Sequence, residues 1–246
     1  MSGIFLYLLV DAITLRWYHG VMGLRGPKPK GKVKIKWSAN FAYAIGLIAT
    51  DGCLYKDGRH ISLTSLDLEQ LNNFNKALDM NVKISTKQAG AGKSCTHIQF
   101  SDVLFHRFLI SIGVTQAKSK TISGVDVPKK YFFDFLRGCL DGDGCFYSYW
   151  DPRWRSSHMF YLTFSSASLK HIEWLRREIN ERANSIGHIS KAHNKSSIYN
   201  LKYAKKEALV IIKKMYYSPN VLCLSRKKEK IQKTLLVEKK QQCLYV

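Results

Sequence analysis

Two stretches of the chain follow one pattern 92 residues apart, Ala44-Ile45-Gly46-Leu47-Ile48-Ala49-Thr50-Asp51-Gly52 and Leu136-Arg137-Gly138-Cys139-Leu140-Asp141-Gly142-Asp143-Gly144. Each is typical of an apolar helix with an internal glycine, and each ends in Asp-Gly before a cysteine and a large apolar residue. A lone Asp-Gly commonly marks only a turn. Because the whole pattern occurs twice, we infer a duplicated unit that brings Asp51 and Asp143 together.

The residues after each motif repeat as well. Ile61-Ser62-Leu63-Thr64 alternates like a half-buried strand, and Leu162-Thr163-Phe164-Ser165 does the same. Apolar residues at helical spacing follow each strand, and a further strand pair precedes a last helix. The offset between the copies grows from 92 to 101, so we place about nine extra residues in a longer hairpin loop between Tyr147 and His158. Each half is predicted as helix, two strands, helix, two strands, helix.

The predicted fold class is α+β, with two pseudo-symmetric αββαββα repeats whose motif helices pair at their interface. Each motif helix has small groups four residues apart on one face, namely Gly46 with Thr50 and Gly138 with Gly142. The two helix backbones can therefore come close. We divide the chain into a basic N-terminal extension (1–37), a first repeat (38–125), a second repeat (126–232) and a C-terminal tail (233–246).

Composition points to a nucleic-acid partner. Lysine and arginine number 39 against 18 aspartate and glutamate, which gives a formal net charge of +21. From Ala12 to Thr50 there is no acidic residue at all. Such an excess over a folded chain commonly serves polyphosphate binding. The alternatives are a solubilising basic surface or an arm for another acidic partner.

The cysteines and the N-terminus indicate the setting. The six cysteines show no close pair with metal-site spacing, which argues against a zinc module. The run from Ile4 to Val10 is too short to span a bilayer, and no basic residue precedes it as in a signal peptide. We expect a monomer in an intracellular, reducing setting with no membrane partner. An organelle and a bacterial or archaeal cytoplasm are not distinguished.

Two carboxylates at the ends of paired helices repel each other unless they share a cation. Hard oxygen ligands suit Mg²⁺, and Mn²⁺ or Ca²⁺ could substitute for binding. The predicted metal site therefore comprises Asp51 and Asp143, together with Gly52 and Gly144 directly after them.

The two acids could also serve other purposes than metal binding. The run from Asp141 to Gly144 could open a calcium loop, but no acid closes it. A paired-aspartate protease fits poorly with the strong positive charge. A purely structural role for each Asp-Gly at its helix end is the remaining alternative.

The two segments resemble the paired motifs of the LAGLIDADG homing endonucleases in their single-chain form, over about residues 41–232. The resemblance implies that Asp51 and Asp143 bind the catalytic metals. It also implies a saddle of two four-stranded antiparallel sheets along the DNA major groove, and cleavage of both strands across the minor groove to leave short 3′ overhangs. The sixth motif position is Ala49 in one copy and Asp141 in the other, a variation that the family tolerates, so Asp141 is not predicted to be catalytic.

The same resemblance implies a basic residue of each half near the scissile phosphates. In the first half we predict Lys120, just before Thr121-Ile122. In the second half we predict Lys227, with Arg226 as the alternative. A cation there could stabilise the charge of the transition state or polarise the attacking water. The competing interpretation is an ordinary phosphate clamp or a solvated charge.

Strand alternation predicts which side chains leave the core. Residues that alternate with the apolar ones point outward, where amides and amines can pair with base edges in a major groove. A plain solvated sheet face would show the same pattern. The predicted DNA-binding residues are Ser62, Thr64, Lys83, His97, Gln99, Ser101, Thr163, Asn200 and Lys202, with Arg153 and Arg155 at flanking phosphates.

These features together predict a monomeric, metal-dependent, site-specific DNA endonuclease, encoded within an intron or similar element. Two alternatives keep the fold and change the class. One is an RNA maturase that binds intron RNA, and the other is a DNA-binding regulator that does not cleave.

Overall fold

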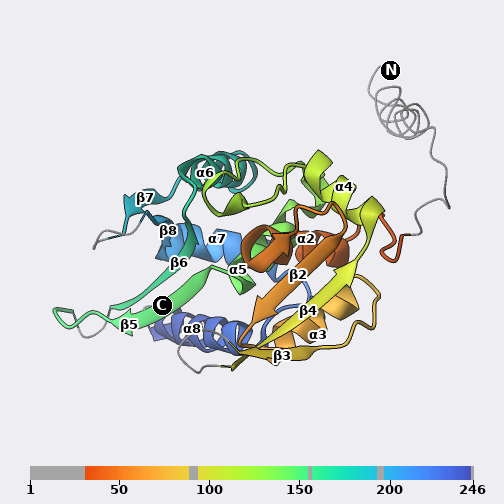
Figure 1. The fold of residues 1–246 in the computed structure, drawn as a ribbon. Helices are drawn as coiled ribbons and strands as arrows, with labels where there is room; N and C mark the ends of the chain where they lie inside the picture. The colour runs from red at the N-terminus through yellow and green to blue at the C-terminus, as the bar shows by residue number, and fades with distance from the viewer. Residues whose placement is uncertain (1–30, 89–93, 155–156, 193–196, 245–246) are drawn as a thin grey trace, which may run out of the picture.

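The computed structural model describes residues 31–88, 94–154, 157–192 and 197–244 (Figure 1). The first half consists of α2 (Ala39–Asp51), β1 (Gly52–Leu54), β2 (His60–Ser65), α3 (Leu68–Ala77), β3 (Ser85–Gln88), β4 (Ser94–Ser101) and α4 (Val103–Ser111), followed by the 3₁₀ turns η2 (Lys118–Lys120) and η3 (Lys129–Tyr131). The second half consists of α5 (Phe132–Asp141), β5 (Cys145–Trp150), β6 (His158–Ser166), α6 (Leu169–Ala183), β7 (His188–Lys191), β8 (Tyr199–Ala204), α7 (Lys205–Met215) and α8 (Ser225–Leu244). The predicted α+β class and its αββαββα repeat are confirmed. Within the described ranges no helix is long and apolar enough to cross a bilayer.

Each half forms one four-stranded antiparallel sheet. The strand orders are β1-β2-β4-β3 and β5-β6-β8-β7, so the two sheets have the same topology. In the first sheet Ile61 lies opposite Phe100 and Leu63 opposite Ile98, and all four are buried. In the second sheet Leu162 lies opposite Tyr203 and Phe164 opposite Leu201, again all buried. Alternation therefore sends one face of each sheet into the core and leaves the other outward.

The motif helices α2 and α5 lie between the sheets, with β2 and β4 on one side and β6 and β8 on the other (Figure 1). Ser38 caps α2, because its hydroxyl accepts the N–H of Phe41 at 3.1 Å. A Cβ added to Gly46 would lie 2.2 Å from the carbonyl oxygen of Phe135, and one added to Gly138 would lie 2.2 Å from that of Tyr43. Only glycine fits at either position, which confirms the predicted close approach of the two backbones.

The hairpin of the second half is longer than that of the first, as predicted, but for a different reason. The strand β5 has 6 residues against 3 in β1, and β6 has 9 against 6 in β2. Most of the added length is therefore strand and not loop, which extends the outward face of the second sheet.

The helix α8 crosses the predicted domain boundary at residue 232 without a break. The hydroxyl of Thr234 donates to that of Ser148 on β5 at 3.2 Å. Glu238 is buried and pairs with Lys205 of α7 at 2.7 Å. The described side chains of α8 therefore pack on the second half as far as Glu238.

Most of the predicted N-terminal extension lies outside the described residues. The described part, residues 31–37, packs on the first half. The amides of Lys32 and Val33 donate to one carboxylate oxygen of Asp102 at 2.6 and 2.9 Å, and Val33 is buried. Asp102 also caps α4 by accepting the N–H of Phe105 at 2.9 Å. One buried acid thus fixes both the start of α4 and the segment before α2.

Candidate functional site

The two motif acids lie where the paired helices end. Asp51 is the last residue of α2, and Asp143 follows α5 by two residues. A Cβ at Gly142 would lie 2.0 Å from the hydroxyl oxygen of Thr50 and 3.0 Å from a carboxylate oxygen of Asp51. The turn that carries the second acid therefore packs directly on the first acid.

The electrostatics of the two acids are coupled. Burial raises the pKa of Asp51 above its usual range, the charge of Asp143 raises it further, and Gln70, Lys118 and Lys227 oppose the rise. Asp143 is the more exposed acid, although partial burial still raises its pKa against the charges of Lys118 and Lys227. A bound divalent cation would relieve this cost of ionisation, so the pair fits a hard metal ion. Among the described residues, no group of three or more His, Cys, Asp or Glu side chains is placed to hold a metal.

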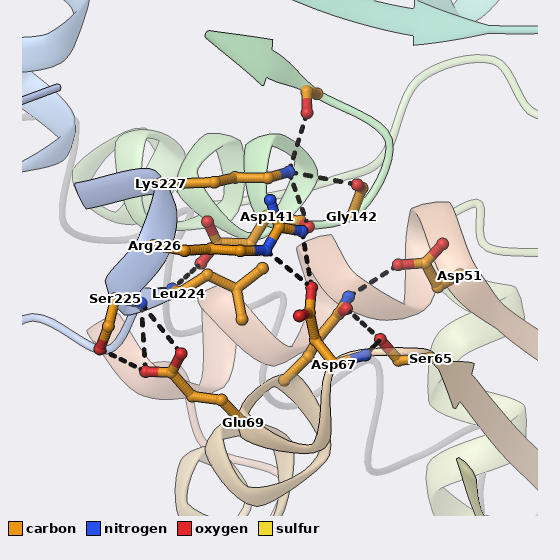
Figure 2. Close-up of polar contacts among 12 residues, drawn as sticks. Asp51, Ser65, Asp67, Glu69, Asp141, Gly142, Leu224, Ser225, Arg226 and Lys227 are labelled. Atoms are coloured by element: carbon orange, nitrogen blue, oxygen red, sulfur yellow. Dashed lines mark hydrogen bonds and ion pairs between the residues drawn. The ribbon is translucent and has the colours of Figure 1, made fainter. Parts of the chain in front are cut away.

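A buried lysine supports each motif end in the same way. The ammonium of Lys118 donates to the carbonyl oxygens of Thr50 and Gly52 at 3.1 and 2.5 Å. That of Lys227 donates to those of Gly142 and Gly144 at 3.4 and 2.8 Å (Figure 2). Lys227 also donates to the carbonyls of Leu140 and Asp141 at 2.5 and 2.9 Å. Burial lowers the pKa of both lysines, while nearby carboxylates raise it.

Of the two lysines predicted near the acids, the structure brings one to the site. Lys227 lies beside the second motif, and its catalytic role stays a prediction. Lys120 is exposed on η2. Lys118, two residues earlier, is buried and points inward. Lys118 is therefore the first-half lysine that contacts the motif end, and the catalytic role of Lys120 stays a prediction. Arg226, the second-half alternative, instead pairs with Asp67 at 2.6 Å.

The predicted metal ligands Gly52 and Gly144 each present a carbonyl that already accepts a lysine N–H. A carbonyl oxygen has two lone pairs, so one remains on each for another partner. The acids Asp51 and Asp143 are the primary candidates for holding a cation.

Gln70 is a site residue that sequence reasoning missed. Its amide nitrogen donates to Asp51 at 2.7 Å, and its amide oxygen accepts the hydroxyl of Ser65 at 2.7 Å. The residue at the equivalent place of α6, 101 positions later, is His171. Its Nδ1 bonds the carbonyl of Ser123 at 2.6 Å, and burial lowers its pKa. The two halves of the site therefore hold their acids differently.

Asp141, which was not predicted to be catalytic, is a buried structural acid. Its carboxylate accepts the hydroxyl of Tyr43 and the N–H of Leu224, both at 2.8 Å. Burial raises its pKa to about 6, against the hydrogen bond from Leu224. One of these carboxylate contacts, the N–H of Leu224, belongs to the segment before α8 and not to a motif end.

That segment, residues 222–227, crosses from the second half to the first, and we call it the strap. Asn73 of α3 donates to the carbonyl of Cys223 at 2.9 Å. Glu69 accepts the N–H of Ser225 at 3.1 Å and so caps α8 from the other half (Figure 2). Lys227 is thereby held at the motif ends by contacts from both repeats.

The predicted sheet residues take the outward faces. In the first sheet Ser62 lies opposite Gln99 and Thr64 opposite His97, and Ser101 lies opposite His60. In the second sheet Thr163 lies opposite Lys202, and Asn200 lies opposite Ser165 and accepts its hydroxyl at 2.7 Å. Lys83 is exposed just before β3. By strand alternation these positions lie on the predicted faces, but Ser62 is buried at 8% exposure, unlike the others. The binding role of all of them stays a prediction.

One of the two predicted arginines, Arg153, lies in the described part of the second-half hairpin loop. The guanidinium of Arg153 pairs with Asp151 at 2.9 Å and is highly exposed. Its hydrogen bonds lower the pKa of Asp151 to about 2. Arg155 lies outside the described residues.

No protein-family model and no curated protein matches the sequence. Solved structures do. The homing endonuclease I-WcaI bound to its DNA recognition sequence is 15% identical, with a TM-score of 0.57 over 85% of this chain and 95% of that one. The LAGLIDADG meganuclease I-AabMI bound to uncleaved DNA is 13% identical, with a TM-score of 0.57 over 82% and 91%. Full-length DUF199/WhiA from Thermatoga maritima is 15% identical, with a TM-score of 0.50. That match covers 81% of this chain but only 61% of the DUF199/WhiA chain. These likenesses show that the chain has the LAGLIDADG fold.

Proposed function

We propose that the chain is a site-specific, Mg²⁺-dependent endonuclease that cuts both strands of a DNA target. The strongest support is the placement of Asp51 and Asp143 at the ends of two helices in backbone contact, each beside a buried lysine. The net charge of +21 suits a polyphosphate partner. Two solved structures with this fold are DNA complexes. One chain supplies both halves, so we propose that it acts as a monomer.

Asp51 and Asp143 would hold the cation. Burial makes their ionisation costly, and at Asp51 the neighbouring carboxylate adds to that cost. When bound, Mg²⁺ would polarise a phosphate oxygen and lower the pKa of a bound water. The carbonyls of Gly52 and Gly144 keep one lone pair each as additional ligands.

The remaining side chains position the acids and supply positive charge. Gln70 fixes the orientation of the Asp51 carboxylate through its amide nitrogen. Lys118 and Lys227 hold the last turn of each motif through main-chain carbonyls. In a DNA complex their ammonium groups would add positive charge near the phosphates of the two strands. Water would attack one phosphate of each strand in line with the leaving oxygen, and cleavage across the minor groove would leave short 3′ overhangs.

The outward sheet faces would lie along the major groove of the target. The polar side chains there present donors and acceptors toward base edges, while exposed lysine and arginine contact phosphates. Lys83 and Arg153 would extend these contacts beyond the sheets.

A second candidate is a DNA-binding protein that does not cleave. It is favoured by the state of the two lysines, because Lys118 and Lys227 are buried and direct their donors to main-chain carbonyls. In this arrangement the lysines stabilise the fold, whether or not a phosphate is present.

The deciding experiment is Mg²⁺-dependent cleavage of a plasmid library that carries randomised target sites, with Asp51→Asn and Asp143→Asn alongside the unaltered chain. Site-specific double-strand breaks that disappear in both variants would establish the endonuclease. Tight, sequence-selective binding without cleavage in Mg²⁺ or Mn²⁺ would favour the second candidate. Selective binding of structured intron RNA that Asp51→Asn leaves unchanged would point to an RNA maturase.

The lysines provide a matched comparison. Lys118→Met is expected to lower the cleavage rate by about 100-fold or more, as does loss of an electrostatic donor in other active sites. Lys120→Met removes the same charge two residues away and is expected to change it less than about threefold. Equal effects of the two variants would mean that Lys118 acts only through overall charge.

A further inference from the structure

Gln99 of β4 and Lys202 of β8 occupy the same place in the two halves. Gln99 lies opposite Ser62, and Lys202 lies opposite Thr163. Ser62 and Thr163 are 101 residues apart, the offset that relates the two repeats after the motifs. Both side chains stand on the outward face of their sheet and reach solvent.

An aromatic residue at equivalent positions holds each of these side chains. Tyr55 and Tyr147 are 92 residues apart, the motif offset. The hydroxyl of Tyr55 donates to the amide oxygen of Gln99 at 3.4 Å. The ammonium of Lys202 lies 5.3 Å from the ring centre of Tyr147 and 3.9 Å from that of Tyr161. The same position of the two half-surfaces thus carries an oriented amide in one case and an oriented ammonium in the other.

The three tyrosines of the second sheet form one stacked group. The rings of Tyr147 and Tyr161 are 5.3 Å apart and those of Tyr149 and Tyr161 are 6.2 Å apart, all near parallel. An ammonium over such rings is attracted by their negative faces. Lysine normally loses much side-chain freedom when it binds, so a lysine already held in place loses less.

Amide and ammonium groups differ in the bases they pair with. Glutamine pairs with N6 and N7 of adenine, and lysine pairs with O6 and N7 of guanine, both in the major groove. We propose that Gln99 and Lys202 are corresponding base readers, Gln99 for adenine and Lys202 for guanine, at two positions equally far from the centre of the DNA target on opposite sides. This rests on the DNA binding in the proposed function but not on cleavage.

An exchange of the two side chains tests the proposal. Double-stranded DNA with randomised positions is selected for binding to the full chain in EDTA, so that binding is measured without cleavage. The selected sites are expected to carry adenine on one side and guanine at the mirrored position on the other. Gln99→Lys is expected to change only the first preference to guanine, and Lys202→Gln only the second to adenine. Lys202→Ala is expected to weaken the guanine preference by about five- to 100-fold.

The tyrosines give a second, independent readout. Tyr55→Phe removes the hydroxyl that orients Gln99 and is expected to weaken the adenine preference. Tyr161→Phe keeps the ring over which Lys202 lies and is expected to leave the guanine preference intact, whereas Tyr161→Leu is expected to weaken it. These residues lie on the outward face, and a thermal unfolding curve for each variant checks that the fold is kept.

The outcomes separate this proposal from the proposed function. A library from which no sites are enriched would overturn DNA recognition itself. Enriched sites whose preferences stay fixed in both exchange variants would overturn the assignment of Gln99 and Lys202. A uniform loss of affinity for all sequences in Lys202→Ala would also overturn it, because a phosphate contact carries no base information.

Discussion

Replacement of Gly46 by alanine is expected to push the two motif helices apart. The added Cβ would lie 2.2 Å from the carbonyl oxygen of Phe135 and 2.9 Å from the amide nitrogen of Cys139. Both are main-chain atoms, so no rotamer change can make room. Overpacking of this kind costs about 1–3 kcal/mol, and the rigid neighbour places the cost near 3 kcal/mol. Alanine regains about 1 kcal/mol in helix propensity, which leaves a net loss of about 2 kcal/mol.

The assay is denaturant unfolding of the unaltered chain and of Gly46→Ala under identical conditions, read as a shift of the midpoint at constant slope. Gly58→Ala is the control, because its Cβ meets nothing within 4 Å, although its φ of +74° disfavours alanine. That variant is expected to lose about 1 kcal/mol from backbone strain and to keep its DNA affinity. A Gly46→Ala chain as stable as the unaltered one would refute the direct backbone contact.

Three further expectations follow. The buried guanidinium of Arg137 lies 2.8 Å from the buried carboxylate of Asp134, so Arg137→Met leaves that carboxylate without its ion-pair partner. The variant is expected to lose about 3–5 kcal/mol of unfolding free energy in the same assay, and a double variant that adds Asp134→Asn should regain part of that loss. Cleavage should decline on acidification at a higher pH than ordinary carboxylates would give, because burial raises the pKa of Asp51 and Asp143 and a protonated acid does not bind a cation; a kcat/KM profile that stays flat down to pH about 4 would contradict this. DNA affinity should fall about 10³–10⁵-fold between about 50 and 200 mM salt if about six to ten phosphates are contacted, and a slope near zero in a salt titration would speak against the basic surface as the binding face.

Much of the fold was predictable because the sequence pattern of one half occurs again in the other. The two motifs and the strands that follow keep a common register, so each copy supports the interpretation of the other. The glycines Gly46 and Gly138 identified the helix contact, since only glycine permits main chains to touch. The helix α8 was not predicted, because part of its buried face consists of polar residues such as Thr234 and Glu238.

The site was less predictable, because its details depend on local backbone geometry. Lys118 and Lys120 are both basic and two residues apart, and only the turn decides which points inward. Ala117, directly before η2, has a left-handed φ of +49°, a conformation that alanine rarely adopts. No sequence pattern predicts it. Gln70 did leave a signal, since the repeat register pairs it with His171, so that both copies carry a polar side chain at the same place of a buried helix face.

The strap also governs when the protein becomes complete during synthesis. Glu69 meets Ser225 across 156 positions, and Asp67 meets Arg226 across 159. Contacts this distant in sequence form late, after the local helices and hairpins. A nascent chain that has passed the second motif therefore carries both acids but lacks the lysine that braces the second of them. The arrangement of acids and lysines at the two motif ends is therefore complete only once the start of α8 has packed against Asp67 and Glu69 of the first half.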